Sequence, residues 1–156
     1  MRRKDREITD LQQILAVIDE ARVLRMALFD GAYPYIVPLH FGYEYEEDRL
    51  VFYMHCAKEG HKLDLIKEDP HACVEVEGEM KVIGAEVPCK FGAIFSSVVA
   101  RGRVQLLQTP EEKIHGLQRI MKQQSGKDFA FDETMAAPIN VLKFTADEFS
   151  AKARTK

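Results

Sequence analysis

Apolar and polar residues alternate with a period of two along much of the chain, which is typical of β-strands with one buried face. The segment from His71 to Glu77 shows this alternation most clearly, with Ala72, Val74 and Val76 at every second position. The expected strands are residues 23–29, 35–43, 50–54, 71–77, 95–104 and about 140–151. The pattern therefore predicts a chain built mainly from strands.

Three segments have helical spacing of apolar residues, and each has a recognisable boundary. The first covers about residues 11–21 and follows Thr9-Asp10-Leu11-Gln12, which resembles a capping box. The second begins near His61 and ends near Asp69-Pro70, because proline disfavours helical conformation in the residue before it. The third follows Thr109-Pro110-Glu111-Glu112, a capping residue with a first-turn proline and a glutamate three residues later. We expect it to end near residues 125–126.

Turn-forming residues mark the connections between these elements. Asp30-Gly31 has the chemistry of a hairpin turn, and residues 44–48 form an acidic turn. Pro38 cannot donate to a strand ladder, so its strand should be an edge or bulged there. Residues 78–92 indicate a long irregular connection. Gly102 predicts a bulge or a close backbone approach within its strand.

The order of elements favours an antiparallel barrel over a doubly wound sheet, because hairpin-linked strands dominate and helices are few. The predicted fold class is mainly β with peripheral helices (α+β). The chain has 156 residues, of which 46% are hydrophobic, so we expect one domain with its own core over residues 1–156.

The charge of the chain limits its partners. A formal net charge of −3 argues against a general binder of nucleic acid or anionic membranes. Arg2, Arg3, Lys4 and Arg6 form a small basic segment that we interpret as a solvated, mobile arm. No apolar run approaches the roughly 18 residues of a membrane span, and the N-terminus does not resemble a signal peptide. We therefore expect a cytoplasmic protein.

The cysteines indicate reduced thiols. Cys56, Cys73 and Cys89 are odd in number and form no C-x-x-C motif, which argues against a disulfide framework or a structural zinc site. Cys56 could react as a thiolate beside Lys58, but a cysteine at the end of a strand is more commonly a small packed apolar group.

The segment from Met54 to Ile66 is the main candidate for chemistry, because an apolar strand there passes through a short polar turn into a helix. Such a helix directs its first unpaired N–H groups and its positive dipole end at the turn. Lys58, His61 and Lys62 add side-chain donors, so the turn has the properties of an anion site, best suited to a phosphate. A solvated strand–helix connection fits the spacing equally well. Neither G-x-G-x-x-G nor the P-loop motif occurs.

Several histidines are candidates for other roles. His40 and His71 could donate protons to a bound substrate, because histidine titrates near neutral pH, although each could also be a hydrogen-bonded structural residue. His55, Cys56 and His61 contain metal-ligand atoms but lack the usual paired spacing, so we expect no metal.

The turn and its surroundings resemble a known superfamily. Ala57-Lys58-Glu59-Gly60-His61-Lys62-Leu63, followed by Asp69-Pro70 and Cys73-Val74-Glu75-Val76, is similar to the pyridoxamine 5′-phosphate oxidase-like superfamily. Residues 33–43 and the pattern His55-x-Ala57-Lys58-Glu59-Gly60-x-Lys62 resemble its nitroimidazole-resistance subgroup. The likeness extends over roughly residues 2–151. It implies a split β-barrel that forms a homodimer and binds FMN at the subunit interface.

The resemblance also implies roles for particular residues. Pro38 and Leu39 would lie along the isoalloxazine ring, residues 55–57 would line the cofactor, and residues 96–98 would approach it from the partner subunit. The serines at 96 and 97 interrupt an apolar strand, and a polar cofactor edge would satisfy their hydroxyls. The complete predicted cofactor-binding set is Pro38, Leu39, His55, Cys56, Ala57, Lys58, Gly60, His61, Lys62, Ser96, Ser97 and Val98.

The sequence departs from the oxidases of the superfamily at two places. Those enzymes carry two basic residues before the glycine, whereas here Lys58 is followed by the acidic Glu59. Either the phosphate affinity is lower here, or Lys62 takes the second role in holding the phosphate. Their basic substrate-binding residues near the C-terminus are not recognisable here, which argues against oxidation of pyridoxamine phosphate. The subgroup resemblance instead implies an FMN-dependent oxidoreductase that reduces nitroaromatic compounds to amines. The alternatives are a non-catalytic flavin- or haem-binding protein and a purely structural domain.

Overall fold

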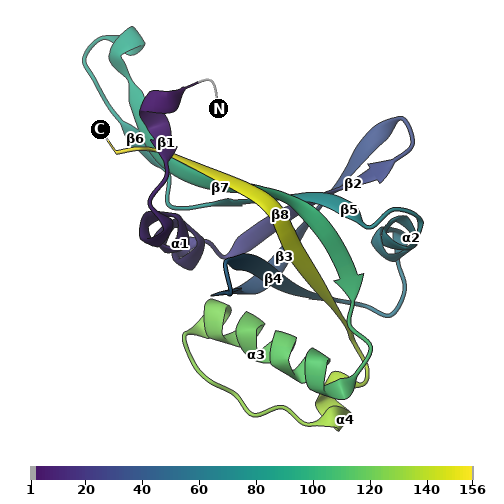
Figure 1. Ribbon diagram of the computed structural model, residues 1–156. Helices are drawn as coiled ribbons and strands as arrows, with labels where there is room; N and C mark the ends of the chain where they lie inside the picture. The colour runs from purple at the N-terminus through teal and green to yellow at the C-terminus, as the bar shows by residue number, and fades with distance from the viewer. Residues whose placement is uncertain (1–2, 156) are drawn as a thin grey trace.

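The computed structural model describes residues 3–155, in which strands form most of the regular structure (Figure 1). The strands are β1 (Glu7–Ile8), β2 (Val23–Asp30), β3 (Tyr33–Glu46), β4 (Arg49–Cys56), β5 (His71–Glu77), β6 (Lys81–Ile83), β7 (Gly92–Leu106) and β8 (Asn140–Arg154). The helices are α1 (Leu11–Glu20), α2 (His61–Glu68), α3 (Pro110–Ser125) and α4 (Glu133–Ala136), with single 3₁₀ turns η1 (Lys4–Arg6) and η2 (Pro88–Lys90).

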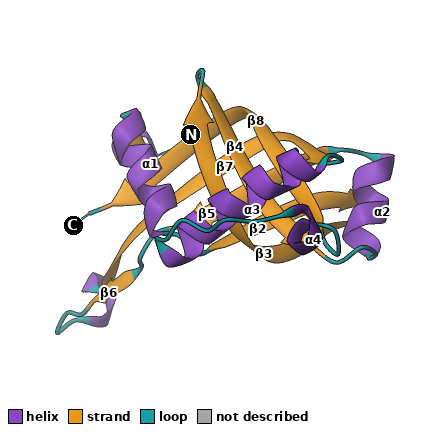
Figure 2. Cartoon of the chain, turned by 90° about the horizontal axis from the view of Figure 1, so that it is seen from below, coloured by secondary structure: helices purple, strands orange, loops and turns teal. Residues whose placement is uncertain are grey.

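The strands form one antiparallel sheet that curls back on itself. Its order is β1-β8-β4-β3-β2-β5-β7-β6, and an additional pairing of β7 with β8 closes a ring. The helices lie around this ring, with α2 at one end and α1 and β6 at the other (Figures 1 and 2). The predicted antiparallel barrel with peripheral helices is therefore confirmed, in a split-barrel-like form.

Two apolar clusters hold the helices to the ring. The interior is filled by alternate residues of the strands, where the ring of Phe52 meets the rings of Phe41 and Phe144. Residues facing outward from β4 and β8, such as Tyr53 and Val141, pack against α3 and α4 in a second cluster. The α3 helix starts at a complete capping box on Thr109, as the sequence predicts. Because the helix is amphipathic, its apolar side covers this outer face.

The glycine at position 102 allows the ring to close. The register of β7 against β8 shifts between Arg101 and Gly102, so the predicted bulge is present. A Cβ atom on Gly102 would collide with the carbonyl oxygen of Thr145, so the backbones also approach as closely as predicted. A larger residue at this position would force the two strands apart.

The β3 strand changes partners along its length. Residues 33–40 pair with β2 in an unbroken register, and residues 41–46 pair with β4. Pro38 therefore lies where β3 pairs on one side only, which confirms the edge prediction and contradicts the bulge. The predicted acidic turn is shorter than expected, because β3 continues to Glu46 and only Glu47 and Asp48 form the turn.

Two segments expected to be irregular contain pairing that the sequence does not reveal. Residues 78–92 include β6, which pairs with β7, and all three β6 residues are exposed, so no alternation marks the strand. The basic N-terminal segment is not a free arm: Lys4–Arg6 form a 3₁₀ turn, and Glu7–Ile8 pair with β8. Arg2 lies outside the described residues.

The first helix begins at Leu11, as predicted, but its capping residue differs from the first residue of the expected capping box. Asp10, rather than Thr9, is the N-cap, and its Oδ1 accepts a hydrogen bond from the Gln13 N–H at 2.9 Å.

In the described part of the chain, no helix is both long and apolar enough to cross a membrane.

Candidate functional site

The main candidate site lies where β3 and β4 separate. Their ladder ends at the Phe41–Met54 pair, after which His55 pairs with Val141 of β8 while His40 pairs with Val23 of β2. The diverging strands leave a shallow cavity of about 310 Å³. Four predicted site residues line it together with Val23, namely Pro38, Leu39, His40 and His55. The fold thus brings together residues that are 15 or more positions apart in the sequence.

The two histidines of this cavity have polar atoms available to a ligand. Neither imidazole has a hydrogen-bond partner among residues 3–155, whereas His61, His71 and His115 each contact a carboxylate. Burial, with a smaller contribution from the neighbouring His40, lowers the pKa of His55 below its ordinary value of 6.5. The His55 ring is therefore neutral at pH 7 and can donate a hydrogen bond from one nitrogen and accept one at the other.

The turn that follows β4 is held in place by the buried side-chain amide of Asn140. Asn140 is 8% exposed, and its Nδ2 donates to the carbonyl oxygens of Ala57 at 3.3 Å and Lys58 at 3.2 Å. Because a trans peptide places its N–H opposite its carbonyl, the N–H groups of Lys58 and Glu59 point away from Asn140. The sequence did not reveal this contact, because it arises from the pairing of Cys56 with Asn140.

Gly60 ends the turn and begins α2. Its φ of 147° lies in a region that favours glycine, and no side chain caps the first N–H groups of the helix. The Nζ of Lys62 lies 4.0 Å from the position that a Cβ on Gly60 would take. The ammonium group of Lys62 and the uncapped helix start therefore face the same small volume.

Lys58 and Lys62 have no carboxylate partner within ion-pair distance in the described part of the chain, unlike Lys67 and Lys122.

Cys56 is 8% exposed and packs in the barrel core, and its burial raises the pKa of the thiol despite the opposing charge of Lys62. The thiolate hypothesis for Cys56 is therefore wrong, because burial favours the protonated thiol.

His61 contacts the β2–β3 hairpin. Its Nε2 lies 2.8 Å from Asp30 Oδ2, and its ring meets Tyr35 edge-on at 5.1 Å. The contact with Asp30 raises the pKa of His61. His61 thus joins α2 to the hairpin, in addition to lying beside the predicted phosphate turn.

His71 lies in a different cavity from His40. Its Nδ1 is 2.6 Å from Asp69 Oδ1, and it lines a cavity of about 580 Å³ with Phe29, Cys73 and Arg101. His40 pairs with the start of β2, whereas the residue after His71 pairs near its end, roughly 15–20 Å away at about 3.3 Å per residue. One chain therefore does not bring the two predicted proton donors together.

Ser96, Ser97 and Val98 lie far from the turn of their own chain. They belong to the first half of β7, beside β6 and α1, and α2 is at the other end of the molecule (Figures 1 and 2). Val98 is only 1% exposed and its side chain faces the core, so a ligand outside the barrel could meet only its backbone. Any contact of these residues with a ligand at residues 57–62 must come from a second chain.

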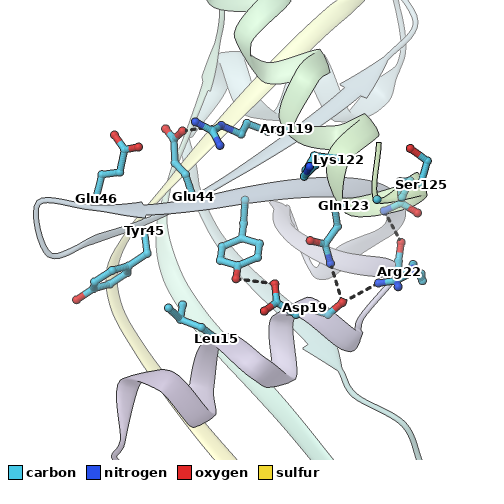
Figure 3. Close-up of a pocket in the computed structure, with 13 residues that line it drawn as sticks. Leu15, Asp19, Arg22, Glu44, Tyr45, Glu46, Arg119, Lys122, Gln123 and Ser125 are labelled. Carbon is cyan, nitrogen blue, oxygen red and sulfur yellow. Dashed lines mark hydrogen bonds and ion pairs between the residues drawn. The ribbon is translucent and has the colours of Figure 1, made fainter. Parts of the chain in front are cut away.

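A wider groove of about 720 Å³ lies between α1, β3 and the end of α3 (Figure 3). None of the predicted site residues lines it. Its charged groups contact one another, since the Tyr43 hydroxyl donates to Asp19 Oδ1 at 2.7 Å and Arg119 Nε lies 3.2 Å from Glu44. These contacts hold the two helices to the barrel. No cluster of three metal-ligating side chains occurs between residues 3 and 155.

A family model described as pyridoxamine 5′-phosphate oxidase matches residues 10–153. No curated protein matches the chain in sequence.

Solved structures with the same fold include three informative relatives. One, from Bacteroides thetaiotaomicron, carries the provisional name 5-nitroimidazole antibiotic resistance protein; it is 26% identical, with a TM-score of 0.81 over 94% of this chain and 86% of that one. A flavocytochrome from Azotobacter vinelandii is 20% identical, with a TM-score of 0.78 over 100% and 72% of the two chains. An FAD- and haem-binding protein from Mycobacterium smegmatis is 18% identical, with a TM-score of 0.77 over 97% and 74%.

Proposed function

The chain belongs to the pyridoxamine 5′-phosphate oxidase family, and on this basis we propose that it is an FMN-binding oxidoreductase that reduces small molecules such as nitroaromatics. The observation that carries the proposal is the separation of β3 from β4. It places a cavity lined by Pro38, Leu39, His40 and His55 next to a turn with two lysines that lack carboxylate partners among the described residues.

The turn has the properties needed to bind the phosphate of FMN. Lys58 and Lys62 supply positive charge, the uncapped start of α2 supplies N–H donors, and Gly60 leaves room for a ligand at the backbone. Asn140 holds the turn in place from the core side. The charge and the hydrogen-bond donors of these residues are those that a phosphate dianion requires.

The cavity has the properties needed beside a flavin ring. Pro38 and Leu39 offer apolar surface, and His55 offers a neutral imidazole for hydrogen bonding. A bound flavin would supply hydride or electron transfer, while the protein supplies orientation and protons. Reduction of a nitro group consumes protons as well as electrons, and His40 lies in the cavity with a ring that can deliver them.

The relatives support the proposal to different degrees. The name of the Bacteroides protein supports nitroaromatic compounds as the substrate class. The two flavin proteins are less than a quarter identical to this chain, so their likeness concerns the fold, and they support flavin binding because this fold can hold such a cofactor.

We also propose that the functional unit is a homodimer with two shared sites. The outer face of the strands β2, β3, β5 and β7 exposes large apolar side chains, including Phe29 at 68% and Ile36 at 60%. Val99 lies on the same face, beside the β7 serines. A second copy covering this face would bury the apolar groups and could bring Ser97, which shares the face of Val99, to its partner's turn. The Ser96 hydroxyl lies on the other face, beside Gly78 and α1, so Ser96 would take part through its backbone.

The experiment that tests the proposal is a spectrum of the purified protein, followed by identification of the ligand released on denaturation. We expect a flavin absorbance spectrum and a released compound with the fluorescence and mass of FMN. A colourless protein should gain this spectrum when FMN is added. A Soret band would instead support the haem-binding alternative. A protein that binds neither cofactor would contradict the proposal.

A further inference from the structure

A third lysine reaches the predicted phosphate turn from a different part of the chain. Lys113 lies in the first turns of α3 and is half-buried, and its Nζ is 3.4 Å from the carbonyl oxygen of Ile139. Ile139 directly precedes Asn140, the residue that holds the Ala57 and Lys58 carbonyls. Lys113 therefore lies next to the segment that Asn140 joins to the Lys58 turn, close enough to Lys58 for the two charges to interact.

The two lysines form a pair of like charges without a compensating carboxylate. No ion pair within residues 3–155 involves Lys58 or Lys113. Glu112, the nearest acid on α3, is already held by the backbone N–H groups of Gln108 and Thr109. Glu133 lines a small cavity with Lys113 but does not reach ion-pair distance.

This arrangement disfavours the charged form of Lys113 in the absence of an anion. Burial, and then the neighbouring Lys58, lowers the pKa of Lys113. An anion that contacts both amines would remove the repulsion and accept hydrogen bonds from each. Binding of an anion between the two amines would relieve this repulsion.

We propose that Lys113 binds the phosphate group of the cofactor together with Lys58, so that α3 forms part of the phosphate site. This inference rests on the proposed FMN-binding function. The proposal adds a residue of α3 to the phosphate site. The sequence motif alone places that site at residues 57–62. Lys113 would also determine specificity, because it would favour FMN over the phosphate-free riboflavin.

The test compares the affinities of FMN and riboflavin for the full chain by titration of flavin fluorescence. Lys113→Met should weaken FMN binding by roughly 10- to 100-fold, the effect of losing a charged hydrogen bond. It should change riboflavin binding by less than about twofold, because riboflavin has no phosphate. Lys113→Arg, which keeps the charge, should retain most of the FMN affinity.

Lys122→Met is the matched control, because it removes the same charge from the same helix at a position that faces the groove of Figure 3. It should leave both affinities within about twofold of the wild type. Circular dichroism confirms that each variant is folded, and Lys113→Gln replaces Lys113→Met if the latter does not fold.

An unchanged FMN affinity in Lys113→Met, or an equal loss for riboflavin, would overturn the inference while leaving the proposed function intact. A wild-type chain that binds neither flavin would overturn the proposed function instead. In that case inorganic phosphate serves as the probe. Phosphate should raise the melting temperature of the wild type and not that of Lys113→Met, and an equal rise in both would refute the role of Lys113.

Discussion

Single side chains near the separation of β3 and β4 differ in whether they have a partner. His61, His71 and His115 each contact a carboxylate, whereas His40 and His55 do not contact one among the described residues. The unpartnered groups gather at one cavity and one turn. This distribution is the reason we propose ligand binding for His40, His55 and the lysines, whereas the other histidines contact carboxylates of their own chain.

Replacement of Lys62 tests the phosphate turn. Lys62→Ala should weaken FMN by roughly 1–3 kcal/mol, or about 5- to 150-fold, because only FMN carries the dianion that this lysine would neutralise. Riboflavin affinity should change little. Isothermal calorimetry with both ligands measures the difference, and an equal loss for the two would remove Lys62 from the phosphate site.

Replacement of His40 tests the source of protons. His40→Ala should keep FMN affinity and slow the reduction of a nitroaromatic at neutral pH, because the imidazole that would donate the proton is missing. The rate is measured across the pH range with FMN-saturated protein. A profile identical to that of the wild type would show that His40 does not supply the proton.

The contact between His61 and Asp30 predicts a pH-dependent stability. The hydrogen bond with Asp30 raises the pKa of His61 above its ordinary value of 6.5, so the folded chain holds this proton more tightly than the unfolded chain. The stabilisation is complete below the unfolded-state pKa and is lost as the pH rises through the folded-state pKa.

His61→Gln should therefore lower the melting temperature more at about pH 5.5 than at about pH 9. Asp30→Asn should remove the same pH-dependent part, because it deletes the other partner. Thermal denaturation at the two pH values provides the measurement. A loss of equal size at both would contradict the assigned coupling.

At the scale of elements, the sequence predicted the strands with regularly alternating burial and the helices with recognisable capping residues. β5 has the predicted bounds because its core-facing residues alternate strictly, and α3 begins where its capping box predicts. β6 was missed because its three residues are all exposed. The N-terminal pairing was missed because β1 is only two residues long.

The candidate site was predictable only in its local parts. The turn at residues 57–62 is continuous in the sequence, so its charges and its helix start could be recognised directly. Asn140 and Lys113 could not, because they reach the turn through the pairing of β8 with β4 and the packing of α3. The separation of His71 from His40 likewise depends on which ends of β2 their strands meet.

The closure of the ring at Gly102 predicts a large effect of a single methyl group. Gly102→Ala should destabilise the chain by about 1–3 kcal/mol, because its Cβ would collide with the Thr145 backbone, which cannot move without parting β7 from β8. Gly84→Ala is the control, since its Cβ would make only ordinary contact with the Phe91 ring, at 3.9 Å. Urea denaturation of both variants gives the comparison. Equal stabilities would show that the closure tolerates a side chain.

At the scale of the whole molecule, cofactor binding and dimerisation should depend on each other. In one folded chain, the turn before α2 and the first half of β7 lie at opposite ends of the molecule (Figures 1 and 2). A site that uses both the turn and the serines of β7 therefore requires two chains. If FMN contacts both, each binding event strengthens the other by the same free energy. A shared site would therefore join cofactor binding to the assembly of the dimer.

Subunit exchange between two inactive variants tests this claim most directly. Lys62→Ala damages the turn, and Ser97→Trp damages the part supplied by the other chain. A mixed dimer would collect both lesions in one site and leave the second site intact. Equal mixing should therefore restore FMN binding at about one quarter of all sites. Mass spectrometry first verifies that the subunits have exchanged. If FMN binding then does not recover, or if sedimentation shows an FMN-loaded monomer, the shared site is contradicted.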